Sequence, residues 1–175
     1  MKKLITSRHI TIAIYSLLFI IALGIWIWEI KKFDEYLIVY NNLDERYELE
    51  SILYGFKITN LFTASISSLI LVLGLFLKNK TGWILVTGWY YLLITNVFQG
   101  IFETGIKDAP EFFHALLSFS IPISLIFLMN KFTGINDYHK IKKSEMLRLN
   151  LLAFGVGILL AVFRVLKKYL LQQYL

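Results

Sequence analysis

Residues Ile10 to Trp28 read ITIAIYSLLFIIALGIWIW, a run of 19 residues without a charged side chain. A bilayer requires about 20 apolar residues in one helix to cover roughly 30 Å of hydrocarbon. A basic segment precedes the run, as in a signal peptide. The run is longer than the apolar core of a signal peptide, about 7 to 15 residues, and it ends in tryptophans and Glu29 instead of small residues. It therefore predicts an uncleaved first transmembrane helix.

Four more apolar runs predict an all-α fold, a polytopic transmembrane helix bundle. The predicted spans are residues 10–28, 59–77, 83–102, 112–129 and 149–166. The last run is short and basic residues follow it, which leaves a four-span bundle as the alternative. In that run Ala153, Gly157 and Ala161 recur every four residues. Such a helix-packing face lets a neighbouring helix approach closely, so five spans are favoured over four.

The composition agrees with a membrane protein and excludes several kinds of site. Hydrophobic residues make up 57% of the chain, against about 45 to 50% in soluble domains. The chain has no cysteine, which excludes thiolate catalysis and cysteine-ligated metals, and its histidines His9, His114 and His139 are widely separated. The net charge of +6 is typical of a membrane protein whose basic loops face anionic lipid. We expect no metal, no cofactor and no nucleic-acid partner.

The distribution of lysine and arginine predicts the orientation. With the N-terminus in the cytoplasm, the inner segments carry ten of these residues and the outer segments five, or eight if the fifth run spans. Because positively charged loops stay inside, we expect a multi-pass protein with a cytoplasmic N-terminus. Its isoleucine, lysine and asparagine content favours a bacterial inner membrane. In the inner loop, residues 130–148, the side chains predicted to contact anionic headgroups are Lys140, Lys142, Lys143 and Arg148.

The segment 29–57 is the longest part predicted to lie outside the bilayer. Apolar residues recur with helical spacing in two stretches: Phe33, Tyr36, Leu37 and Tyr40, then Leu49, Ile52, Leu53 and Phe56. The turn signal Asn41–Asn42 separates them. The pattern predicts a protruding helical hairpin between spans one and two, with seven acidic against four basic residues. The alternative is a β-strand at 36–40, whose residues favour sheet.

Several polar residues fall within or beside the predicted spans, where a charge costs roughly 2.5 to 3.5 kcal/mol at mid-helix. Those predicted to form a polar pocket open to the outside are Asn60, Thr63, Gln99, Glu103, Glu111 and His114. Within this set, His114 with a neighbouring glutamate could move a proton or hold a cation. The alternative is structural. Asp108 and Glu111 have capping-box spacing at a helix start, and the uncharged polar residues would join helices through hydrogen bonds.

Three functions fit these features, and the favoured one is a non-catalytic integral membrane protein that acts through protein–protein contacts. It would be an accessory or scaffold subunit, or an immunity-type protector, with its partner in the membrane or at the outer hairpin. The alternatives are a small oligomeric transporter or channel that uses the polar pocket, and a membrane enzyme acting on lipid or quinone. No phosphate-binding loop, zinc-protease motif or serine-hydrolase motif is present, which favours the first.

A single cysteine tests the orientation, because the chain has none of its own. We expect Lys80→Cys to stay unlabelled by a membrane-impermeant maleimide in intact cells and to react once the membrane is opened. Lys107→Cys, in a predicted outer segment, is the matched control and should react in intact cells. Labelling at position 80 from outside would reverse the orientation.

Overall fold

The computed structural model describes residues 2–41, 52, 55 and 61–174, and all the regular elements in these ranges are helical. They are α1 (Lys2–Asn41), α3 (Leu61–Phe76), α4 (Lys80–Thr104), α5 (Ala109–Lys131), α6 (Thr133–Tyr138), the 3-10 helix η1 (Lys143–Glu145) and α7 (Met146–Tyr174). The predicted all-α fold is confirmed. The alternative of a strand at 36–40 is wrong, because these residues continue α1 without a break.

Four helices, α1, α4, α5 and α7, are long and apolar enough to cross a membrane. The last predicted run therefore belongs to a helix of spanning length, the 29-residue α7. The apolar part of α1, His9–Ile38, extends beyond the predicted 10–28. Helix α3 has 16 residues in its described part, or about 24 Å at 1.5 Å per residue. The described residues thus form a helical membrane bundle with four candidate spans and one shorter apolar helix.

The predicted hairpin 29–57 is described in its first half only. That half continues α1 as one helix to Asn41. Most of the second half lies outside the described residues. Gly55 is an exception, and it lies against the rings of Phe33 and Tyr36. This contact is the one expected if the chain returns alongside α1.

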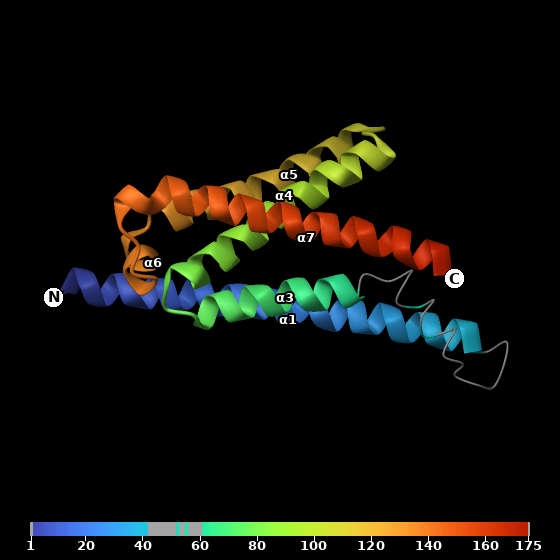
Figure 1. Ribbon diagram of the computed structural model, residues 1–175, viewed down its shortest axis with the longest axis horizontal. Helices are drawn as coiled ribbons and strands as arrows, with labels where there is room; N and C mark the ends of the chain where they lie inside the picture. Colours follow the sequence, from blue (N-terminus) through green and yellow to red (C-terminus); the bar gives the residue numbers. More distant parts are fainter. Residues whose placement is uncertain (1, 42–51, 53–54, 56–60, 175) are drawn as a thin grey trace.

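The helices form two groups that meet at one end of the molecule (Figure 1). In one group α3 packs antiparallel to α1. In the other, α4 packs extensively against α7 and also against α5. The groups are joined where α3 turns into α4 and where α6 contacts α1. We call this the closed end, and the opposite end, where α4 and α7 finish, the open end. The closed half of α4 carries the most buried side chains, including Trp83, Val86 and Tyr90.

Only five residues separate the predicted spans 59–77 and 83–102, which predicts a tight turn, and the turn from α3 to α4 is tight. Helix α3 ends at Phe76 and α4 begins at Lys80. The side chain of Asn79 caps α4 by accepting a hydrogen bond from the backbone N–H of Gly82 at 3.0 Å. A Cβ atom on Gly82 would lie only 2.0 Å from the carbonyl oxygen of Leu77. A glycine is therefore required for the two helices to lie this close.

The contact between α4 and α7 is built on small residues. A Cβ atom on Gly157 would lie 2.6 Å from Cβ of Tyr91 and 2.9 Å from the carbonyl oxygen of Gly88. Ala153 and Ala161, one turn to either side on α7, are also buried. Without a hydrophobic driving force between helices in lipid, such close van der Waals contact is a main source of helix association. The small face of α7 is therefore occupied by α4 of the same chain.

We expect Gly157→Leu to destabilise the protein by about 1 to 3 kcal/mol, as is typical when a packed core is overfilled. The measurement is thermal unfolding in a mild detergent. Gly155→Leu is the matched control on the same helix, because a Cβ atom there meets nothing within 4 Å. Equal losses in both variants would contradict the close α4–α7 contact.

Candidate functional site

Four of the residues predicted to form an outer pocket lie near the open end, where α4 connects to α5: Gln99, Glu103, Glu111 and His114. Gln99 donates a hydrogen bond to Glu103 one turn later, with 2.8 Å between Nε2 and Oε1. Glu111 and His114 line a cleft of about 540 Å³ between α4 and α5. The structure therefore gathers these residues in two pairs, one at the end of α4 and one at the start of α5.

The start of α5 uses Glu111 as a structural group. Asp108 is the N-cap, as predicted, and its Oδ1 accepts a hydrogen bond from the backbone N–H of Glu111 at 2.8 Å. The Glu111 carboxylate in turn accepts from the backbone N–H of Lys107 at 2.9 Å. The first interaction satisfies a backbone donor that a helix start leaves without a partner, and the second holds the residue that precedes the N-cap. The Glu111 carboxylate therefore stabilises the start of α5.

The other two residues of the predicted pocket are Asn60 and Thr63. Asn60 and the side chain of Thr63 lie outside the described residues. The principal helix contacts of α3 are with α1 and α4, whereas those of α5 are with α4 and α6. A pocket formed by three converging helices stays a prediction, and the described cleft is formed by α4 and α5.

A second cluster of polar groups occupies the closed end and centres on His139. This side chain is fully buried between α1 and the α3–α4 turn. Its Nδ1 lies 3.1 Å from the carbonyl oxygen of Asn79, and a carbonyl only accepts, so Nδ1 carries a proton. Its Nε2 lies 2.5 Å from the hydroxyl of Tyr15 and accepts that hydrogen. One imidazole thus joins α1 to the turn.

The surroundings of His139 keep the ring neutral. Burial lowers its pKa to about 4, against the smaller opposing effect of the hydrogen bond to Asn79. The neighbouring Tyr138 packs edge-on against Tyr15 and donates a hydrogen bond to the carbonyl of Leu75 at 3.0 Å. Lys80 and Glu145 add an ion pair at 2.5 Å that links α4 to η1. The segment between α5 and α7 is therefore fastened to three helices.

An asparagine pair links α5 to α7 near the same end. Nδ2 of Asn150 lies 2.6 Å from Oδ1 of Asn130, and Nδ2 of Asn130 lies 3.3 Å from Oδ1 of Asn150. The hydroxyl of Tyr91 on α4 adds a contact of 3.4 Å to Asn150. Each amide is also bonded to a backbone carbonyl of its own helix. The pair supplies its own donors and acceptors where water is scarce.

Sequence analysis missed both closed-end clusters. His139 lies in a loop rich in lysine, and its isolation from other histidines argued only against a metal site. The signal available was the pair of asparagines, Asn130 and Asn150, each at the boundary of a predicted apolar run. The predicted headgroup contacts Lys140, Lys142, Lys143 and Arg148 are all exposed on this part of the chain. Their contact with lipid remains a prediction.

The chain matches no protein family model, no curated protein and no solved structure. The chemistry of the polar clusters therefore rests on their geometry alone. The described ranges contain no group of three or more histidine, aspartate or glutamate side chains placed to hold a metal ion. What the polar clusters do, in these ranges, is cap helices and join them.

The buried histidine predicts a loss of stability in acid. The pKa of His139 is about 4 in the folded protein and about 6.5 in an unfolded chain, so the unfolded chain takes up the proton first. The contribution of neutral His139 to the free energy of unfolding is complete above pH 6.5 and is lost as the pH falls towards 4. Each pH unit in this range costs about 1.4 kcal/mol, so the whole loss is about 3 kcal/mol. Thermal unfolding in detergent across this range measures it.

His139→Gln should remove most of this acid sensitivity, because the amide does not titrate. His114→Gln is the control, since His114 is exposed, and it should leave the acid sensitivity intact. Unfolding curves of the His139→Gln variant that shift with pH as steeply as those of the wild type would contradict the burial of a neutral imidazole.

Proposed function

We propose that this protein is a non-catalytic integral membrane protein that binds another protein within the bilayer, through the outward face of α5. Helix α5 lies at the edge of the bundle, and its principal contacts are with α4 and the short α6. Pro122 and Met129 are its buried residues. The face turned away from them is free to meet lipid or a partner.

The observation that carries the proposal is a pair of serines in the centre of this outward face. Ser120 and Ser124 are exposed and four residues apart, so they lie one above the other. Large exposed side chains flank them on the same side of the helix: Phe113, Leu117 and Phe127. Small residues at this spacing let a second transmembrane helix approach closely. The hydroxyl of Ser120 donates to the carbonyl of Leu117 in its own helix and can still accept a hydrogen bond across the contact. We call these five residues the α5 outer face.

The molecule already uses the same device internally. The face of α7 formed by Ala153, Gly157 and Ala161 packs against α4 and buries Gly88. From the sequence this face was expected to pack closely against a neighbouring helix, and in the structure that neighbour is α4 of the same chain. The α5 outer face has comparable small residues and no helix of this chain packed over it in the described part.

Transport or catalysis through the outer polar residues is less well supported. The carboxylates of Glu103 and Glu111 accept hydrogen bonds from neighbours along their own segment of chain. A catalytic acid and base would instead be expected to lie within hydrogen-bond reach of the same bound substrate. The favoured roles are accordingly an accessory or scaffold subunit, or a protector that blocks a toxin inside a bacterial inner membrane.

The proposed orientation has the closed end in the cytoplasm. Two lysine-containing connections, the α3–α4 turn and the α5–α7 segment, lie together at the closed end and support this orientation. Lys80 and Glu145 join them by an ion pair. The exposed Lys140, Lys142, Lys143 and Arg148 would then face anionic headgroups, which attract such residues by about 1 kcal/mol each.

Cross-linking in cells tests the partner contact. Ser120→Cys and Ser124→Cys each carry a photoactivatable thiol label, and Leu159→Cys on α7 is the control because Leu159 is 70% exposed. We expect one discrete adduct with another protein from positions 120 and 124 and none from 159. Equal adducts at all three positions, or none, would contradict the proposal. An adduct between two copies of the chain would show that the partner is a second copy of this protein instead of a different one.

Filling the serine groove provides a second test. Ser120→Leu with Ser124→Leu should reduce co-purification of the cross-linked partner in mild detergent by roughly tenfold, equivalent to about 1.4 kcal/mol. The melting temperature of the protein alone should not change, because both side chains are exposed. Unchanged co-purification would argue that the partner binds elsewhere.

A further inference from the structure

The two helix groups separate towards the open end and leave a cleft between them. Near that end α1 and α3 stay together, and the indole N–H of Trp26 donates to the hydroxyl of Ser65 at 2.8 Å. Helix α7 makes its principal helix contacts with α4 and η1, on the other side. A wedge between two helix groups in a bilayer has to be filled, because lipid or protein must cover its walls.

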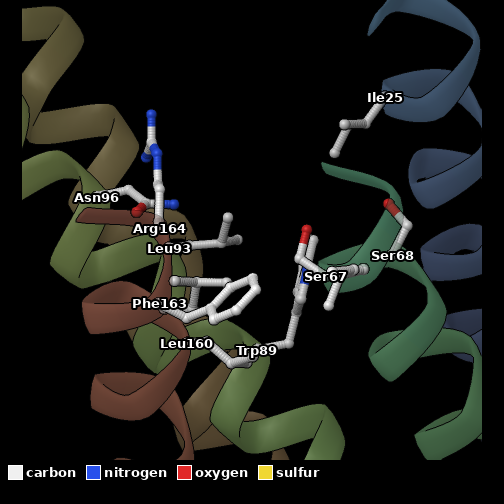
Figure 2. A pocket seen from close by; sticks show the side chains of 11 residues that line it. Ile25, Ser67, Ser68, Trp89, Leu93, Asn96, Leu160, Phe163 and Arg164 are labelled. Atoms are coloured by element: carbon white, nitrogen blue, oxygen red, sulfur yellow. The ribbon is translucent and has the colours of Figure 1, made fainter. Parts of the chain in front are cut away.

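The cleft has a volume of about 190 Å³, and four helices line it (Figure 2). Its lining includes Ile25 of α1, Ser67 and Ser68 of α3, Trp89, Leu93 and Asn96 of α4, and Leu160, Phe163 and Arg164 of α7. Figure 2 shows Arg164 and Asn96 on the α4–α7 wall, with Ile25 and the serines on the facing wall. A transmembrane helix, about 10 to 12 Å wide with its side chains, is too wide for this space.

The lining changes from apolar to polar along the cleft. Helices α4 and α7 both run from the closed end to the open end (Figure 1). Asn96 follows Trp89 by seven residues, and Arg164 follows Leu160 by four. The amide and the guanidinium therefore lie nearer the open end than the apolar residues do. This gradient matches an amphipathic molecule whose polar group sits at the mouth.

Polar atoms of the lining have no partner of their own. The hydroxyl of Ser68, a residue only 7% exposed, and Oδ1 of Asn96 are buried without a hydrogen bond to any described residue. Arg164 is half-buried and pairs with no carboxylate in the part of the chain that the structure describes. An unpaired buried polar group costs about 1 to 3 kcal/mol, and more when it is charged. A ligand that carries an anion for Arg164, a hydroxyl that donates to Oδ1 of Asn96 and an oxygen that accepts from Ser68 would satisfy all three.

We propose that this cleft binds one anionic phospholipid from the surrounding bilayer. Arg164 binds its phosphate, since a guanidinium fork matches phosphate oxygens, and a headgroup hydroxyl donates to Oδ1 of Asn96. One acyl chain lies against Trp89, Leu93 and Phe163, and Ser68 donates to a polar group of the glycerol backbone. The apolar walls favour a lipid over free phosphate, and the unpaired cation favours an anionic lipid over a zwitterionic one.

Lipid binding to the purified full-length protein in neutral detergent tests the proposal. Phosphatidylglycerol and phosphatidylcholine with the same acyl chains are compared by native mass spectrometry, with inorganic phosphate as a third ligand. We expect the wild type to retain phosphatidylglycerol at least tenfold more tightly than phosphatidylcholine. Arg164→Gln should remove this preference. Lys107→Gln, which removes one exposed cation near the same end, is the matched control and should keep it.

A fluorescence measurement locates the acyl chain. In a Trp26→Phe, Trp28→Phe background, brominated phosphatidylglycerol should quench Trp89, which is buried from bulk lipid at 4% exposure. Trp83, buried near the closed end, serves as the unquenched reference. Leu93→Trp, which narrows the cleft, should reduce lipid retention even if Arg164→Gln proves unstable.

Four results would overturn the proposal. One is equal retention of the two lipids by the wild type. Another is retention by Arg164→Gln at the wild-type level. The third is binding of inorganic phosphate alone with the affinity of the lipid, which would make the site one for a free anion. A cross-link from Leu93→Cys to a protein in cells would likewise assign the cleft to a protein.

Discussion

The close approach of Gly88 on α4 to Gly157 on α7 is the constraint on which the arrangement of the other helices depends. A side chain at either position would hold the helices apart, and in lipid no hydrophobic force would restore the contact. Because α7 is held on this side, α4 becomes the helix that α3, α5 and α7 share. The cleft near the open end exists because α7 packs along α4, whereas α1 packs with α3, and the two groups separate.

The closed end meets a different requirement, which is to satisfy polar groups where little water is present. The imidazole of His139 uses one nitrogen to donate and the other to accept, and the amides of Asn130 and Asn150 do the same for each other. Such networks give the fold its specificity, since each donor has one well-placed acceptor.

Hydropathy and spacing predicted the helices, the N-cap at Asp108 and the tight turn before α4, because each depends on residues close in sequence. The helical continuation of α1 through residues 36–40 follows the same local pattern and overrides the sheet preference of its side chains. The role of His139 could not be predicted, because its partners, Tyr15 and Asn79, are distant along the chain. The separation of the two helix groups also escaped prediction, since crossing angles depend on the shapes of packed side chains. The cleft beside Arg164 follows from that separation.

Helices α4 and α7 run in the same direction, so the chain must cross the bundle through α5 and α6 before the two can meet. During synthesis, α4 enters the membrane with the groove around Gly88 uncovered, and it stays so until residues 146–166 have been made and inserted. The nascent protein therefore passes through a stage in which its most contact-rich helix is exposed to lipid and to other inserting chains. Completion of the contact between α4 and α7 depends on the arrival of α7.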